Sequence, residues 1–100
     1  MPENIVKVSY MDHIFYNCSK LTSIDLSNFN TENVISMNNI FGGCSSLTFI
    51  DISSFKMGPI NKIYYIFDDS LPNYGNIKIN RTFYNRLGNF DLKNWNITFV

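Results

Sequence analysis

Two stretches of this sequence are near copies of each other. Residues 11–29 read MDHIFYNCSKLTSIDLSNF, and residues 37–55 read MNNIFGGCSSLTFIDISSF. Apolar residues recur at the same offsets after a shift of 26 residues, so the chain carries a tandem repeat. A third, looser copy spans residues 60–79 with a one-residue slip, and residues 83–92 retain only a remnant. We therefore predict a single repeat domain over 1–100, with repeats at 8–33, 34–59 and 60–80 and an irregular C-terminal cap or partial repeat at 81–100.

Each repeat combines two periodicities. Apolar residues at spacings of three and four predict a short helix in the first half, with one buried side. The second half, at 21–29 and again at 47–55, alternates apolar and polar residues, which predicts a strand buried on one face. The expected helix stripes consist of Val8, Met11, Ile14, Phe15 and Cys18, then Val34, Met37, Ile40, Phe41 and Cys44, then Ile60, Ile63, Ile66 and Phe67.

Stacking of the repeats is the arrangement that buries both apolar faces. A helix of about ten residues is marginal alone in water, and one strand beside it cannot bury its apolar face. We expect successive strands to pair in parallel, with short helices on the opposite face and Phe15, Phe41 and Phe67 stacked between them. The predicted fold class is therefore α/β, a short solenoid resembling leucine-rich-repeat proteins.

Composition and charge narrow the function classes. The chain has 100 residues, 45% of them hydrophobic, with 8 basic and 8 acidic residues. Zero net charge argues against a nucleic-acid partner, and no apolar run is long enough for direct membrane insertion. Residues 1–10 also lack the pattern of a signal peptide. We therefore expect neither a signal peptide nor a transmembrane segment in this chain.

The repeat from 37 to 55, with its copy from 11, resembles the BspA-type leucine-rich repeat, also seen in mollicute lipoproteins. Residues 8–59 fit that pattern well, residues 60–79 fit loosely, and residues 90–96 are similar to 24–30. The resemblance implies a cell-surface or secreted protein-binding or adhesion array. It brings no catalytic motif.

Chemistry-bearing residues are few. Cys18 and Cys44 share a repeat position, so a disulfide is geometrically conceivable, although stacked cysteines more often act as small buried apolar residues. His13 is expected on the polar side of its helix, and with two cysteines it lacks the paired spacing of a zinc site. Because no nucleophile elbow or phosphate loop occurs, we predict no enzyme activity, no metal and no cofactor.

The outward face of the strands is the candidate binding surface. Alternation places every second polar residue of each predicted strand on that face. Phe49 stands out as an exposed aromatic, a candidate anchor for a protein partner. The alternative is a purely structural spacer whose polar strand face is simply solvated. The predicted contact residues are Ser23, Asp25, Ser27, Phe49, Asp51, Ser53 and Lys78.

The N-terminal edge of the predicted sheet is the other candidate contact. Residues 1–7 are too short to cover a first strand at 21–29, so that edge is expected to be open. We expect it to be available for self-association or for pairing with an upstream repeat.

Overall fold

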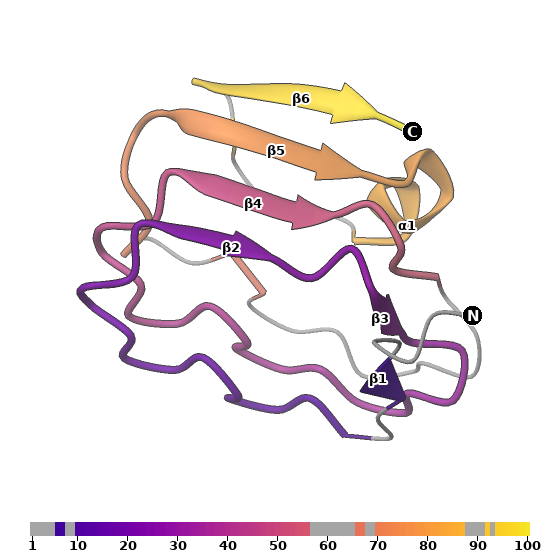
Figure 1. Cartoon of the computed structure of the whole chain (residues 1–100). Helices are drawn as coiled ribbons and strands as arrows, with labels where there is room; N and C mark the ends of the chain where they lie inside the picture. The colour runs from indigo at the N-terminus through magenta and orange to yellow at the C-terminus, as the bar shows by residue number, and fades with distance from the viewer. Residues whose placement is uncertain (1–5, 8–9, 57–65, 68–69, 88–91, 93) are drawn as a thin grey trace.

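The computed structural model describes residues 6–7, 10–56, 66–67, 70–87, 92 and 94–100. These residues form a small mixed α/β domain with parallel strands and one short helix (Figure 1). The strands are β1 (Val6–Lys7), β2 (Ser23–Asp25), β3 (Phe29–Asn30), β4 (Phe49–Ile52), β5 (Gly75–Ile79) and β6 (Trp95–Phe99), and α1 spans Arg81–Arg86.

The main sheet has four parallel strands in the order β2-β4-β5-β6. Its register pairs Ile24 with Ile50 and Ile50 with Ile77, as the repeat alignment predicts. The strands are shorter than predicted. A turn ends the strand of the first repeat, and in this turn Phe29 N–H donates to Leu26 C=O at 3.0 Å. The same turn follows β4, where Phe55 N–H donates to Ile52 C=O at 3.1 Å.

The predicted helices of the first two repeats are wrong. Residues 12–17 and 38–43 form consecutive turns instead. We call the segments that contain them the first turn segment (residues 10–18) and the second turn segment (residues 36–44). Positive φ angles explain why no helix forms, because an α-helix needs negative φ at each residue. They occur four residues apart in each turn segment, at His13 and Asn17 and at Asn39 and Gly43. The third predicted helix, at 60–67, lies outside the described residues except for Ile66 and Phe67.

Hydrogen bonds between the two turn segments replace those of a helix. The amides of Met11, His13, Phe15 and Asn17 donate to the carbonyls of Ser36, Asn38, Ile40 and Gly42, at 2.9, 2.9, 3.1 and 2.6 Å. Every second amide of the first turn segment therefore finds its partner in the next repeat. Apolar spacings of three and four arise here from turns rather than from a helical face.

The core lies between the sheet and the turn segments. Phe15, Phe41 and Phe67 form the predicted ladder, with ring centroids 6.1 and 6.0 Å apart and planes tilted by 15° and 16°. Phe55 meets Phe83 of α1 edge to face at 5.5 Å. The prediction that this ladder fills the space between the layers is confirmed. The largest fully buried side chains are Phe41, Phe55, Phe83, Met11, Met37, Ile40, Leu47, Ile50, Ile52, Ile77, Ile79 and Val34.

Residues 81–100 contribute regular structure. Asn80 caps α1 by accepting from the amides of Thr82 and Phe83, at 2.9 and 3.2 Å. Residues 90–96 resemble residues 24–30 in sequence, but this match does not predict where the last strand begins. Strand β6 begins at Trp95, which pairs with Gly75 of β5. The close approach of Trp95 explains the glycine, since a Cβ at Gly75 would lie 2.7 Å from the indole.

The N-terminal edge is only partly open. Strand β1 pairs in parallel with β3, so the short N-terminal segment does cover the end of the predicted 21–29 strand. Strand β2 still lies at one end of the four-stranded sheet, and β6 lies at the other (Figure 1).

Candidate functional site

Two rows of side chains cross the outward face of the sheet. The strand register aligns Ser23, Phe49, Asn76 and Asn96 in one row, and Asp25, Asp51, Lys78 and Thr98 in the next. Intervening residues such as Ile24 and Ile77 point into the core. We call these eight residues the outward strand face. The polar character of this face follows from the alternation in the sequence.

The predicted site residues lie together but differ in exposure. Ser23, Asp25, Ser27 and Lys78 are exposed, whereas Ser53 is half-buried. Phe49 is half-buried rather than fully exposed, which corrects the prediction of an exposed aromatic. Asp51 is only 9% exposed, although the strand register places it on the outward strand face as expected. Asp51 lies between Asp25 and Lys78 in the second row.

Serine residues two positions further along the chain form hydrogen bonds to the carboxylates of Asp25 and Asp51. Asp51 Oδ1 accepts from the Ser53 amide at 3.0 Å and from the Ser53 hydroxyl at 2.7 Å. In the equivalent position, Asp25 Oδ1 accepts from the Ser27 amide at 2.9 Å. The Ser27 hydroxyl and amide hydrogen bonds lower the pKa of Asp25; desolvation opposes them, and the positive charge of Lys78 adds the smallest lowering effect. Asp25 is therefore a fixed negative charge near neutral pH.

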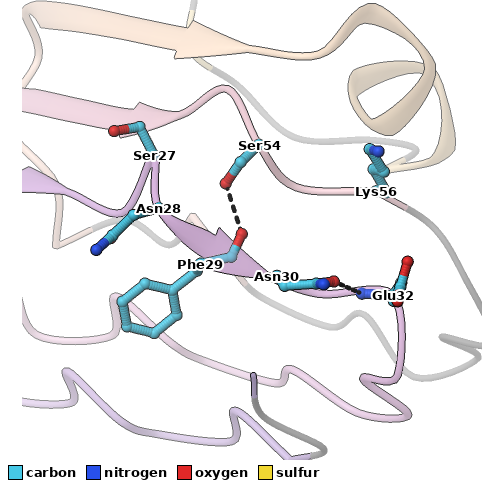
Figure 2. A pocket seen from close by; sticks show the side chains of 7 residues that line it. All are labelled: Ser27, Asn28, Phe29, Asn30, Glu32, Ser54 and Lys56. Carbon is cyan, nitrogen blue, oxygen red and sulfur yellow. Dashed lines mark hydrogen bonds between the residues drawn. The ribbon is translucent and has the colours of Figure 1, made fainter. Parts of the chain in front are cut away.

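A shallow depression of about 230 Å³ lies beside this face, at the carboxyl ends of β2 and β4. Ser54 Oγ donates to Phe29 C=O at 2.8 Å, and the Lys56 amide donates to Thr31 Oγ1 at 2.7 Å, so two successive repeats build its floor. Figure 2 shows Ser27 and Asn28 toward one end, and Glu32 and Lys56 toward the other. Its lining residues are Ser27, Asn28, Phe29, Asn30, Glu32, Ser54 and Lys56.

Sequence reasoning missed this depression except for Ser27. Its residues come from two segments that look like ordinary turns, and only the 26-residue register brings them side by side. The run of Asn28, Asn30 and Glu32 was the available signal, because polar residues then follow the end of a predicted strand.

The remaining chemistry-bearing residues are placed as follows. Cys18 and Cys44 form no disulfide with each other; Cys44 is buried and its Sγ donates to Phe15 C=O at 3.1 Å. His13 is exposed and meets Tyr16 edge to face at 5.2 Å. Within the described part of the chain, histidine, cysteine and acidic residues form no cluster of three that could hold a metal ion. Over the same residues, no helix has the length and apolar character needed to cross a bilayer.

The fold and the sequence repeat together define a class: a small mixed α/β repeat domain built on a parallel sheet. The chain belongs to the family described as "Mycoplasma protein of unknown function, DUF285", whose model matches residues 3–100. This is a mollicute family, in agreement with the kind of organism that the sequence resemblance indicates. Comparisons with curated proteins and with solved structures give no significant match.

Proposed function

We propose that this chain is a non-enzymatic protein-binding or adhesion module. In this proposal it is a short solenoid of the BspA type, with parallel strands on one side and stacked turn segments on the other. Its contact surface is the outward strand face, and its setting is the cell surface. Membership of a mollicute repeat family and the 26-residue register support this reading, because stacked repeats commonly use the extended surface of their sheet for binding.

The half-buried ring of Phe49 is the observation that carries the proposal. It lies on the polar face of the sheet, in register with exposed Ser23 and exposed Asn76. Binding energy at protein interfaces concentrates in aromatic residues surrounded by polar contacts that exclude water. Because its strand and both neighbouring strands hold Phe49 in place, little conformational entropy would be lost when a partner covers it.

Charge would orient the partner. Asp25 and Lys78 carry opposite charges in the second row, and both are exposed. Such charges at the rim of an interface fix register and steer encounter more than they add affinity. We infer a partner surface with an apolar centre flanked by one basic and one acidic group.

Position-specific photocrosslinking tests this proposal. A photoreactive phenylalanine analogue replaces Phe49 in one variant and exposed Asn85 of α1 in a control, and both are irradiated on intact cells. We expect position 49 to give a discrete protein adduct that excess unmodified chain suppresses, and position 85 to give none. Equal adducts from both positions, or none from position 49, would refute binding through the outward strand face.

The second candidate is a structural spacer, and local hydrogen bonding favours it. Asn96 Nδ2 donates to Asn76 Oδ1 at 3.1 Å, and the carboxylates of Asp25 and Asp51 bind the serines two residues on. A face that satisfies its own polar groups in this way needs no ligand. Photocrosslinking without any competed adduct at position 49 is the result that the spacer requires.

A further inference from the structure

The depression at the carboxyl ends of β2 and β4 is built by two consecutive repeats. One wall consists of residues 27–30 and 32 of the first repeat, and the other consists of Ser54 and Lys56 of the second. Because the 26-residue register brings these walls together, the depression depends on the stacked fold rather than on one local turn. Its volume of about 230 Å³ leaves room for a small ligand. It shares only Ser27 with the predicted contact residues of the sheet.

Hydrogen bonds between the repeats hold the two walls in place. Ser54 Oγ lies 3.0 Å from Leu26 C=O and donates to Phe29 C=O at 2.8 Å. Thr31 Oγ1 accepts from the Lys56 amide at 2.7 Å and donates to the Lys56 carbonyl at 3.0 Å. The backbone on both sides of the depression is therefore ordered before any ligand arrives, and little conformational entropy of the protein would be lost on binding.

Three kinds of group face the depression. Phe29 is half-buried, and its ring is seen face-on in Figure 2. Asn30 Oδ1 accepts from the Glu32 amide at 2.9 Å, which orients the carboxamide, and the Asn30 Nδ2 atom makes no hydrogen bond to the described residues. The side chains of Glu32 and Lys56 lie toward the same end (Figure 2), yet the described part of the chain shows no ion pair between them. The depression thus offers an aromatic face, an oriented amide donor and two opposite charges.

This combination selects the chemical class of the ligand. A bound anion would lie near Glu32 and a bound cation near Lys56, so neither is favoured. A wholly apolar ligand would leave the half-buried Asn30 amide without a hydrogen-bond partner. A saccharide ring satisfies every group, because its hydroxyls both donate and accept while one of its faces carries C–H groups that pack on an aromatic ring.

We propose that this depression binds one pyranose ring of a carbohydrate. The C–H face of the sugar packs against Phe29, and the Asn30 amide donates to a hydroxyl. The Glu32 carboxylate accepts from hydroxyls and the Lys56 ammonium donates to them, which gives charge-assisted hydrogen bonds. Because the depression is shallow, a ring at the end of a glycan chain fits it as well as a free sugar does. The site is separate from the outward strand face and does not depend on the proposed protein contact.

NMR titration with simple sugars tests this proposal. The probes are glucose, galactose, mannose and N-acetylglucosamine, each as the free sugar and as the methyl glycoside, added to the full chain. At least one probe should shift the amide signals of residues 28–32 and 54–56 and saturate at millimolar concentration. Saturation by a methyl glycoside identifies a chain-terminal ring as the source, and saturation by free sugar alone identifies a free saccharide. The proposal is overturned if no probe gives saturable shifts, or if glycerol gives the same shifts.

Exposed charged residues provide matched variants. Glu32→Ala and, separately, Lys56→Ala should each weaken sugar binding about tenfold, because each removes a charge-assisted hydrogen bond. Lys78→Ala removes the same kind of side chain from the outward strand face and should bind sugar normally. All three residues are exposed, so circular dichroism should not change. Sugar binding that survives both Glu32→Ala and Lys56→Ala would overturn the site. Binding of glycine in place of every sugar would also overturn it, since the ligand would then be an amino acid.

Discussion

Ile14 and Ile40 occupy equivalent positions in consecutive turn segments, and among the described residues only Ile40 has a turn segment on its N-terminal side. Ile40 is fully buried and Ile14 is 41% exposed. The N–H of Phe15, next to Ile14, donates to Ile40 C=O at 3.1 Å, so the first segment covers the second directly. Equivalent residues in this chain thus contribute differently to stability according to their place in the stack.

The first prediction compares truncation at these two positions. Ile40→Ala should lower the free energy of unfolding by about 2–5 kcal/mol, because it leaves a cavity in a fully packed site. Ile14→Ala should cost under about 1 kcal/mol, since solvent already reaches the side chain. Urea unfolding followed by circular dichroism measures both. Equal losses would contradict the difference in exposure between Ile14 and Ile40.

The phenylalanine ladder gives the second prediction. Phe41 stacks on both Phe15 and Phe67 and is fully buried, whereas Phe15 is half-buried. Phe41→Ala should destabilise the fold by about 3–5 kcal/mol, and Phe15→Ala by clearly less. Thermal unfolding of the two variants is the measurement, with Phe41→Leu as a milder control. A larger loss at Phe15 than at Phe41 would rule out a ladder centred on Phe41.

Left-handed backbone in the turn segments gives the third prediction. Gly43 has φ of 79°, and a Cβ there would meet Asn17 Oδ1 and lie 3.0 Å from Asn17 Cα. Gly43→Ala should therefore destabilise the fold by more than about 1 kcal/mol. Asn39, with φ of 54°, tolerates that conformation, so Asn39→Gly serves as the control and should change stability little. If Gly43→Ala unfolds at the wild-type temperature, the segment adopts another backbone.

Acid titration of Asp25 gives the fourth prediction. Its pKa is held below the usual range by the Ser27 hydroxyl and amide, and to a smaller degree by Lys78. The folded state thus binds its proton less readily than the unfolded chain does, and the stabilising contribution, present above about pH 4, disappears as the pH falls through the folded pKa.

NMR titration of the Asp25 carboxyl group measures this effect. Ser27→Ala should raise the pKa toward its ordinary value. Lys78→Gln should raise it less, and that smaller change should vanish in high salt because the two charges are exposed. A Ser27→Ala variant with an unaltered Asp25 pKa would show that the serine does not hold this carboxylate.

Strand register was predictable from the sequence and turn-segment conformation was not. The pairing of Asp25 with Asp51 and of Asp51 with Lys78 follows from matching repeats, because a shift of one residue would turn apolar side chains outward. Spacings of three and four are ambiguous, because tight turns also bring every third or fourth residue to the same side. The usable signal was the Asn17, Asn39 and Gly43 series, since Asn and Gly tolerate positive φ.

The candidate site was only partly predictable. Alternation placed Ser23, Asp25 and Lys78 on the exposed face, but it did not predict that Asp51 and Phe49 in the neighbouring strand are more buried. The depression lined by Phe29 and Lys56 depends on two turns stacked across repeats, a contact that no local pattern encodes.

Stacking of turn segment on turn segment underlies this repeat domain, and amide hydrogen exchange tests it most directly. The amides of Met11, His13, Phe15 and Asn17 donate to the next segment, whereas that of Ile14 does not. We expect slow exchange at these four alternating amides and fast exchange at Ile14. Uniform protection from residue 14 through residue 18, as in an α-helix, would contradict this account.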